Sequence, residues 1–527
     1  MPAASVLDCA IVGGGVSGLY AGWRLASAPD ARVRADSPPA TCVFELTDRT
    51  GGRLHTAPVA GSSAKVELGA MRFWKAQQLL TSLLEQFHID VEPFPSDDLK
   101  AAYVRGAYLR AADFATPANV PFRLAGAEVG KSPIDLLLHA MQQVVPNVLA
   151  LTDEEWDAFQ ARPDIRDRGF WNLLASVLSN EGYQLLWTAS GIESAYTNWN
   201  AGEAMQLMTR IINAFIAGGL FRPKRGWSEL PDTLRARYER AGGSVSLHRR
   251  LLTITHTTDE QGPLFELGFA TPDDAAIVER RRARTVLLAL PKRPLELLMN
   301  NLPAGAPRLE SLLDAVDAIP AFRLYFGYDA PWWTADYGEH GYAVTDLPLR
   351  QVFYGMGLAG SDADNDRVLM ASYADYVPSL FWSPLARYSR SFWVEVHRQH
   401  TGVSTAAVSE RSGQAHDALV DQALQQLRQM HGRPGIPRPT WSTFKDWGAP
   451  PAGGAWHAWR AGISVRDFVP LLRQPLPPLP LFVCGEAYSA MQGWVEGALT
   501  STEKVLQSAP FGLSRPDWLS PDYDLGP

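Results

Sequence analysis

The chain has 527 residues, too many for a single hydrophobic core, so we expect two or three domains. Its composition, 46% hydrophobic and 20% charged, is typical of a globular enzyme, and its net charge of −8 argues against nucleic acid or an anionic membrane as a partner. No apolar run approaches the ~18 residues of a membrane-spanning helix, and the N-terminus lacks a signal-peptide pattern. The three cysteines stand in apolar, strand-like contexts, so we expect no disulfide framework and a cytoplasmic location.

A glycine-rich turn follows the first predicted strand. Residues 6–12 are mostly apolar, as in a buried strand, and the pattern G-x-G-x-x-G then falls on Gly13, Gly15 and Gly18, with Ser17 inside it. Such glycines permit a tight turn, close approach of a pyrophosphate to the backbone, and close packing of helix on strand. The helix predicted after the turn would direct its free N–H groups at the phosphates. The motif therefore predicts dinucleotide binding, with a purely structural turn as the alternative.

The second predicted strand, residues 41–45, ends in an acid that can accept hydrogen bonds from an adenosine ribose. A polar loop that contains prolines, residues 27–39, precedes it. An E-x-x-x-R-x-G-G-R pattern then falls on Glu45, Arg49, Gly51, Gly52 and Arg53. This pattern resembles the second flavin-binding motif of the amine oxidase flavoproteins, and the resemblance implies that the cofactor is FAD.

The rest of the chain alternates between helical and strand-like patterns. Helical spacing occurs in residues 134–145, 153–161, 169–178 and 201–215, which we interpret as an inserted helical subdomain. A helix, a Gly-Gly stop and strands then follow over residues 232–241, 244–247, 251–256 and 285–290, which is typical of a doubly wound sheet. We interpret the basic cluster at 280–284 as a solvated turn before the last of these strands, rather than a nucleic-acid patch. Further strands are predicted at 321–328, 351–356, 367–373 and 481–484, and a helix at 415–430.

These patterns predict an α/β protein with a Rossmann-like FAD-binding domain, a mixed α+β substrate domain and the inserted helical subdomain. We place the FAD-binding domain in three parts, residues 1–76, 223–300 and 441–527. The substrate domain takes residues 77–222, which include the helical subdomain, and 301–440.

The C-terminal part carries the most specific resemblance. Residues 481–488 and 492–498 resemble the closing motif of flavin amine oxidases, in which a Gly-Glu pair contacts FAD and the next helix points its N-terminus at the flavin. Together with the earlier motifs, the resemblance covers four segments over nearly the whole chain. It implies cofactor contacts from Gly13, Gly15, Ser17, Gly18, Glu45, Arg49, Gly52, Arg53, Gly69, Ala70, Met71, Arg72, Leu251, Trp447, Gly485, Glu486, Gly493, Trp494 and Val495. No cysteine lies near 453–459, where relatives with covalent flavin carry one, so we expect noncovalent FAD and no metal.

Residues 69–72 resemble the G-x-M-R segment of L-amino acid oxidases, whose arginine binds the substrate carboxylate. A guanidinium suits this role because it offers two parallel N–H donors, although Arg72 in a surface salt bridge is the alternative. The same resemblance implies a second carboxylate contact from the hydroxyl of Tyr354; Phe353 would occupy that position if the register slipped by one residue. It also implies that the carbonyl of Gly493 accepts from the substrate amine and that Trp494 shapes the pocket.

One position departs from the family pattern. Arg323 stands where the family keeps a lysine that holds a water near the flavin, so either it takes that role or the alignment is shifted. Trp456, in the apolar segment 453–459, is either a wall of the pocket or part of the core.

The implied reaction is oxidation of an L-amino acid at Cα by hydride transfer to flavin N5, which gives a 2-oxo acid, ammonia and H2O2. The expected partners are the amino acid and O2, without nucleic acid or membrane, and we expect a homodimer. Three alternatives remain: an L-amino acid 2-monooxygenase, an oxidase of simple amines or polyamines, and an FAD-binding scaffold without activity. The preferred side chain is not readable, because pocket residues come from distant segments.

Overall fold

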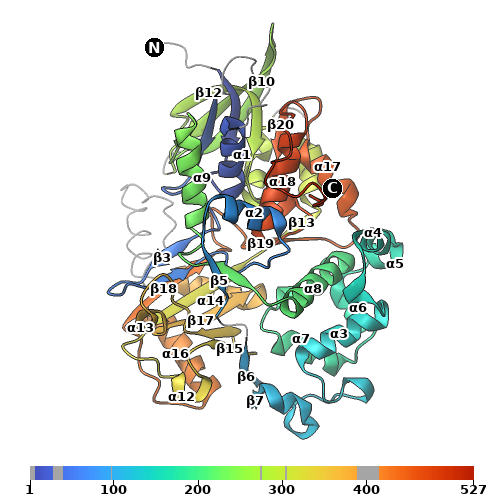
Figure 1. Cartoon of the computed structure of the whole chain (residues 1–527), viewed down its shortest axis with the longest axis vertical. Helices are drawn as coiled ribbons and strands as arrows, with labels where there is room; N and C mark the ends of the chain where they lie inside the picture. The colour runs from blue at the N-terminus through green and yellow to red at the C-terminus, as the bar shows by residue number, and fades with distance from the viewer. Residues whose placement is uncertain (1–5, 28–39, 96–97, 273–275, 303–305, 388–414) are drawn as a thin grey trace.

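The computed structural model describes residues 6–27, 40–95, 98–272, 276–302, 306–387 and 415–527. Two seven-stranded sheets lie at the centres of the upper and lower halves of the molecule, and a layer of helices lies beside the lower sheet (Figure 1). The loop expected over residues 27–39 lies, beyond Ser27, outside the described residues. Among the helices of the described ranges, none has both the length and the apolar character that a membrane span requires.

The upper sheet brings together the N-terminal, central and C-terminal parts of the chain. Its strands are β1 (Leu7–Val12), β2 (Thr41–Phe44), β9 (Ser244–Ser246), β10 (Arg250–Asp259), β11 (Gly262–Ala270), β12 (Glu279–Leu288) and β20 (Leu481–Val483). They run in the order β10-β11-β12-β1-β2-β9, and the pairs β1–β2, β1–β12, β2–β9 and β12–β20 are parallel. β11 and β20 pair with successive parts of β12, residues 279–283 and 286–288.

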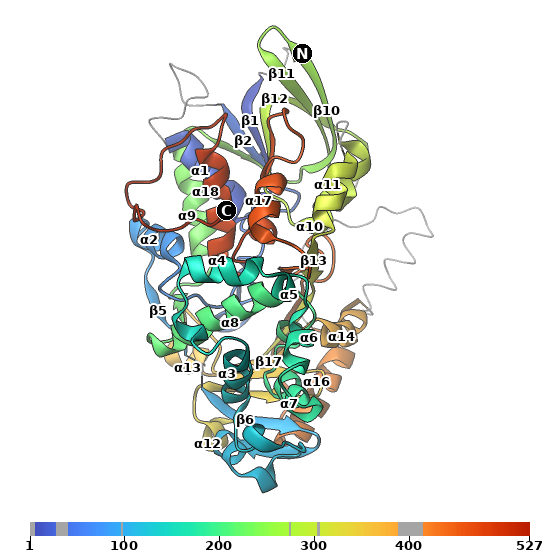
Figure 2. The ribbon, with the colours of Figure 1, turned by 90° about the vertical axis from the view of Figure 1, so that its right-hand side faces the viewer.

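Helices cover both faces of this sheet, which explains why β1 is buried along its whole length. On one face lie α1 (Val16–Ser27), α9 (Glu229–Arg240) and α18 (Val495–Gln507), packed side by side (Figures 1 and 2). The other face packs against α10 (Lys292–Leu298), α11 (Ala306–Leu313) and α17 (Val465–Arg473). The Rossmann-like, doubly wound fold is therefore confirmed.

The basic cluster at 280–284 is not a turn, contrary to the prediction, because β12 already begins at Glu279. The first half of β12 pairs with β11, and of the four arginines in the cluster only Arg280 is exposed while the others are half-buried. There Arg280 pairs with Glu266, and Arg284 pairs with Asp259. The cluster thus lies along a β-strand, where acids of β10 and β11 pair with two of its arginines.

The lower sheet is mixed and is built mainly from segments predicted to form the substrate domain. Its strands, in the order β18-β14-β17-β16-β15-β6-β7, are β18 (Trp441–Asp446), β14 (Ala321–Gly327), β17 (Val368–Asp375), β16 (Gln351–Tyr354), β15 (Gly341–Thr345), β6 (Leu99–Val104) and β7 (Ala107–Arg110). Because the sheet also contains β18, the predicted start of the last FAD-binding part at residue 441 is wrong. One face packs against α12 (Thr334–Tyr337), α14 (Val377–Arg387) and α16 (Asp417–His431). The other face packs against residues 57–74 of the FAD-binding part and is called the site face below.

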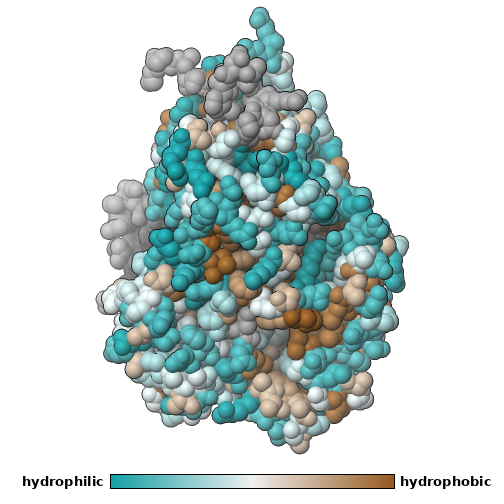
Figure 3. Space-filling view, viewed as in Figure 1, coloured by the Kyte–Doolittle hydropathy of each residue, from teal (hydrophilic) through white to brown (hydrophobic). Residues whose placement is uncertain are grey.

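The helical layer consists of α3 (Pro133–Val144), α4 (Asp153–Ala161), α5 (Pro163–Arg166), α6 (Phe170–Ala175), α7 (Asn180–Ala189) and α8 (Ala201–Ile216). It carries a broad apolar area on its surface, low on the right in Figure 3. The predicted patterns did not include α7, which begins after Ser179, whose hydroxyl accepts from the Gly182 N–H at 3.0 Å. The remaining elements are β3 (Thr56–Pro58) with β4 (Lys65–Glu67), α2 (Gln78–Gln86), β5 (Val91–Pro93) with β8 (Phe221–Pro223), β13 (Val316–Ile319) with β19 (Trp456–Trp459), and α13 (Asp362–Asn365).

Candidate active site

The glycine-rich turn between β1 and α1 has the shape of a pyrophosphate cradle. Gly13 has a φ of +106°, and a Cβ on it would lie 2.4 Å from the carbonyl oxygen of Ala289. A Cβ on Gly18 would lie 2.0 Å from the carbonyl oxygen of Gly13, so helix and strand can meet only with glycine there. No described atom lies within 4 Å of a Cβ placed on Gly15, which leaves open space beside the backbone at the start of α1. The turn therefore fits the diphosphate of FAD.

Ser17 and Arg49, both predicted to contact the cofactor, form hydrogen bonds that hold the loops around the cofactor site in place. Ser17 Oγ donates to the carbonyl oxygen of Ala498 at 3.2 Å, which ties α1 to α18. The Arg49 guanidinium donates to the carbonyl oxygen of Gly52 at 2.7 Å. Glu45 Oε2 accepts a backbone N–H of the glycine turn at 2.7 Å, so this carboxylate lies where a ribose hydroxyl would bind.

Two further loops lie against the glycine turn. A Cβ on Gly52, where φ is +56°, would lie 3.4 Å from the Cα of Gly15. The segment that contains Gly69 in turn lies on this loop, because a Cβ there would be 1.8 Å from the carbonyl oxygen of Arg53. The N–H of Ala70 donates to the same carbonyl at 2.9 Å. The glycines predicted for cofactor contact thus form one stack of closely packed backbone.

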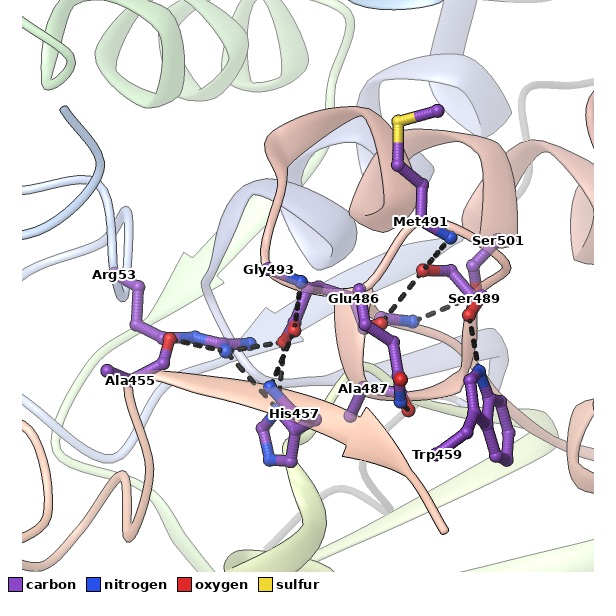
Figure 4. Close-up of polar contacts among 12 residues, drawn as sticks. Arg53, Ala455, His457, Trp459, Glu486, Ala487, Ser489, Met491, Gly493 and Ser501 are labelled. Atoms are coloured by element: carbon purple, nitrogen blue, oxygen red, sulfur yellow. Dashed lines mark hydrogen bonds and ion pairs between the residues drawn. The ribbon is translucent and has the colours of Figure 1, made fainter. Parts of the chain in front are cut away.

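The carboxylate of Glu486 joins three segments at the centre of the site (Figure 4). Its Oε2 accepts from Arg53 Nη1 at 2.5 Å and lies 2.9 Å from His457 Nδ1. Its Oε1 accepts the backbone N–H groups of His457 at 2.9 Å and of Gly493 at 2.6 Å. Burial alone would raise the pKa of this carboxyl group, but the Arg53 charge, His457 and the Gly493 N–H lower it to about 2. Glu486 is therefore an ionised residue that positions the loops around the cofactor.

The turn before α18 offers an open backbone. Gly485 and Gly493 have φ values of +136° and +85°, and no described atom lies within 4 Å of a Cβ placed on Gly485. Trp494 precedes Val495, the first residue of α18, and its side chain makes no capping hydrogen bond. The free N–H groups of this helix N-terminus are suited to an electron-rich part of the cofactor.

Glu496, in the first turn of α18, is a positioning residue that the sequence analysis did not identify. It is completely buried, and its two oxygens accept the N–H groups of Leu79 at 2.9 Å and Leu80 at 2.7 Å. It thereby caps the N-terminus of α2 across more than 400 residues of sequence. Burial raises its pKa to about 7. No local pattern marks such a residue, because its partners are backbone groups of another segment.

Arg72 lies on the site face of the substrate sheet. Its side chain is half-buried, and the guanidinium carbon lies 5.3 Å from the centre of the Phe94 ring. Phe94 meets Phe353 of β16 edge to face at 6.4 Å. In the same packed layer, Met71 is buried and Trp74 meets Trp494 at 4.3 Å. Arg72 and Trp494, predicted to contact substrate, therefore belong to one cluster.

The placement of Tyr354 at the substrate is wrong. Its ring stacks on Tyr337 at 4.9 Å, and its hydroxyl lies 3.4 Å from His431 Nε2, all on the face opposite the site. Side chains alternate along β16, so the site face carries Phe353 instead, as the alternative register implied. Tyr342 of β15 is paired with Phe353 of β16, and the two rings stack at 5.3 Å. This brings a half-buried tyrosine hydroxyl to the site side from the neighbouring strand.

Arg323 braces the FAD-binding segment, while a lysine stands beside it. Its Nη1 donates to the carbonyl oxygen of Glu67 at 3.0 Å. Directly across from it in β18 lies Lys445, which is 6% exposed and whose ammonium lies 4.4 Å from the Trp447 ring. Trp447 Nε1 donates to the carbonyl oxygen of Leu68 at 2.6 Å, next to Gly69. Because Trp447 directly follows β18 and lies only two residues after Lys445, the predicted role of Trp447 could have pointed to Lys445.

Leu251 and Trp456 are the remaining residues that the sequence analysis singled out. Leu251 is buried in the core cluster that contains Val12 and Phe44, at the end of β2 where the ribose is expected. Trp456 is half-buried and would lie 3.4 Å from a Cβ on Gly493, so it belongs to the site wall as well as to the core. Within the described ranges, no group of three or more metal-ligating side chains is close enough to hold an ion.

The sequence and the fold were compared with those of known proteins. The chain matches the family model of flavin-containing amine oxidoreductases over residues 16–505. It is 22% identical to achacin of Lissachatina fulica, over 95% of this chain and 92% of that protein. It is 24% identical to an L-amino-acid oxidase of Mus musculus, over 69% of this chain and 53% of that protein. The structure is similar to that of a redesigned putrescine oxidase, with a TM-score of 0.65 at 17% identity, covering 94% of this chain and 97% of the other.

The family match contains the loop at 51–53, the segment at 69–72 and the Glu486 network, and the backbone cradle described above fits the dinucleotide. The protein therefore belongs to the flavin-containing amine oxidoreductases, and its cofactor is FAD.

Proposed function

We propose that this protein oxidises L-amino acids at Cα with O2 as acceptor, giving a 2-oxo acid, ammonia and H2O2. The position of Arg72 carries the proposal: a half-buried guanidinium lies three residues after Gly69, over Phe94 and in the same cluster as Trp494. Such a group matches the geometry and charge of a carboxylate, which simple amines lack. The similarity to the mouse L-amino-acid oxidase supports the same substrate class.

The residues of the chain act by orientation. When bound, FAD would supply the redox chemistry, as acceptor of the Cα hydride and donor of electrons to O2. Arg72 holds the carboxylate, Tyr342 adds the hydroxyl that Tyr354 cannot supply, and the Gly493 carbonyl accepts from the neutral amine. Trp494 bounds the pocket, so three fixed points leave one enantiomer productive. Lys445, beside Arg323, provides a buried positive charge at the segment that contacts FAD.

The test is a substrate panel with product analysis. We expect peroxide, ammonia and a 2-oxo acid from one or more of the twenty L-amino acids, and none from their D enantiomers. The matching decarboxylated amines, putrescine among them, serve as the comparison set. Recovery of an amide one carbon shorter would assign the protein to the L-amino acid 2-monooxygenases. Turnover of amines alone would refute the proposal.

Oxidation of simple amines or polyamines is the second candidate. Two observations favour it: the structural similarity to a putrescine oxidase, and the phenylalanine, without a hydroxyl, at position 353 of the site face. It differs measurably from the first candidate because its substrates need no carboxylate contact.

A further inference from the structure

A small hollow, with room for about one water-sized group and partly open to solvent, lies between α8 and the loop that precedes Gly493. From α8 it is lined by Glu203, Leu207 and Arg210, which recur at helical spacing on one face. Gln492 lines it from the loop, and its Cα is about 3.8 Å from that of Gly493. Leu207 also packs against the cluster that holds Trp494. The hollow therefore adjoins the place where the substrate amine is proposed to bind.

Two hydrogen-bond acceptors in this hollow have no partner. Within the described ranges, the carboxylate of Glu203 forms neither a hydrogen bond nor an ion pair. Gln492 is 5% exposed, and its Oε1 has no hydrogen-bond partner among the described residues. Its Nε2 donates to the carbonyl oxygen of Ala487 at 2.6 Å, which fixes the amide with Oε1 as the unpaired atom. A ligand that fits these two acceptors must donate hydrogen bonds.

Two tryptophans that line the hollow favour a cation over an anion. Trp199 Nε1 donates to the carbonyl oxygen of Ala195 at 3.2 Å, and Trp459 Nε1 donates to that of Ser489 at 3.0 Å (Figure 4). Both indole donors are thus used within the protein, and a ligand meets aromatic rings rather than N–H groups. The two indoles therefore offer an anion no hydrogen-bond donor in the hollow.

The charges around the hollow agree with this polarity. Burial and the like charge of Asp157 on α4 raise the pKa of Glu203, Arg210 lowers it, and the result is about 7. Arg466 pairs with Asp157, whereas no cation of the described residues forms an ion pair with Glu203. Arg210 is seven residues further along α8, about 10 Å away, and its charge also acts on Tyr523, which donates to buried Glu496. The acceptor end at Glu203 is therefore the end that needs a cation.

We propose that this hollow binds the distal cationic group of the substrate, an ammonium or guanidinium, with Glu203 and Gln492 Oε1 as acceptors. The inference rests on the proposed oxidation of L-amino acids and names their class as the basic ones. A lysine side chain extends about 6 Å from Cα to its nitrogen, a length suited to a hollow that begins one residue from Gly493. Glu203 is then a residue that determines specificity at the distal end of the substrate.

The test compares L-lysine with L-norleucine, which has nearly the same shape but no ammonium. We expect the wild-type protein to prefer lysine in kcat/KM. Glu203→Gln should reduce kcat/KM for lysine by about 10- to 150-fold, the value of a hydrogen bond to a charged group, and the value for norleucine far less. Glu154→Gln, on the exposed side of α4, removes the same charge and should keep the wild-type ratio. Flavin absorbance shows that each variant is folded and loaded.

The pH dependence of the preference for lysine over norleucine is a second test of Glu203. In wild type, the preference for lysine should fall as the pH drops below about 7, because Glu203 then becomes protonated and neutral. In Glu203→Gln this change should be absent. The comparison uses the ratio of the two substrates, so titration of either substrate amine at Cα cancels.

The outcomes separate the subsite from the proposed function. Equal kcat/KM for lysine and norleucine, or an unchanged ratio in Glu203→Gln, would overturn the subsite while amino acid oxidation stands. A preference for L-glutamate that is lost in Arg210→Gln would also overturn it. Oxidation of cadaverine in place of lysine, with the same dependence on Glu203, would support the subsite and refute the proposed function.

Discussion

Replacing Glu486 by glutamine should destabilise the FAD site, because one carboxylate serves three chain segments. Arg53 Nη1 lies at 2.5 Å, the His457 N–H at 2.9 Å and the Gly493 N–H at 2.6 Å, and 6% of the Glu486 side chain is exposed. Glutamine keeps the shape, but it has a single acceptor oxygen and no charge. At least one donor and the Arg53 charge would therefore lose their partner.

The size of the effect follows from the titration of Glu486. Its environment lowers the pKa from the ordinary value of 4.5 to about 2, against the effect of burial. This difference corresponds to roughly 3 kcal/mol at neutral pH. Removal of one partner of a buried ion pair costs about 3–5 kcal/mol, which agrees. Because the folded-state pKa is the lower one, the stabilisation is complete above about pH 4.5 and disappears as the pH falls toward 2.

The assay is urea unfolding at pH 7, followed by tryptophan fluorescence and by release of FAD. We expect Glu486→Gln to lose roughly 3 kcal/mol and to purify with less than one FAD per chain. The exposed substitution Glu154→Gln controls for loss of charge alone. The difference between Glu486→Gln and wild type should shrink in acid. Unchanged stability and FAD content at pH 7 would show that Glu486 does not hold the site together.

Four further substitutions test the substrate side. Arg72→Lys keeps the charge but loses the two parallel N–H donors of the guanidinium. The value of kcat/KM for amino acids should therefore fall by roughly 30- to 900-fold, or about 2–4 kcal/mol, while the FAD content stays normal. Wild-type kinetics would contradict carboxylate binding by Arg72. Lys445→Met should slow reoxidation of the reduced enzyme by O2 about tenfold or more in stopped-flow experiments, because a buried positive charge is lost; an unchanged rate would exclude Lys445 from that step. Tyr342→Phe should raise KM for amino acids about tenfold, whereas Tyr354→Phe should leave it nearly unchanged; the opposite pattern would restore Tyr354 to the site.

The cofactor-binding elements could be predicted because their chemistry is local. Gly18 is required by a contact within one turn, because an added Cβ would lie 2.0 Å from the carbonyl oxygen of Gly13, and the sequence pattern records that requirement directly. Gly13 is required by its own φ of +106°, although the carbonyl oxygen at 2.4 Å from its added Cβ is that of distant Ala289. The same holds for the strand β1, whose burial on both faces appears as an apolar run interrupted only by Asp8. FAD as cofactor and the Rossmann-like fold were both confirmed for this reason.

The substrate side depends on contacts between distant segments. Whether Phe353 or Tyr354 faces the site depends on the pairing of β16 with β15 and on a register shift against β17, between Gln351 and Phe353. The position of Lys445 next to Arg323 depends on the pairing of β18 with β14, more than 100 residues apart. A single sequence encodes these registers only through packing of the whole sheet. The sequence therefore predicted that Phe353 and Tyr354 point to opposite faces, but not which of them faces the site.

The assembly of the upper sheet from distant segments determines when the protein can mature on the ribosome. β1 ends at Val12, but β12 gains its parallel neighbour β20 only after Leu481 has been made. At about 5–20 residues per second, synthesis of the whole chain takes roughly half a minute to two minutes. The stretch from the end of β12 at Leu288 to Leu481 takes roughly a third of that time, during which this strand edge stays unpaired and prone to aggregation. Glu486, which orders the loops around the cofactor, emerges later still. Binding of FAD is therefore among the last events of biogenesis. High-yield production should depend on slow expression and on chaperones that cover the unpaired edge of β12.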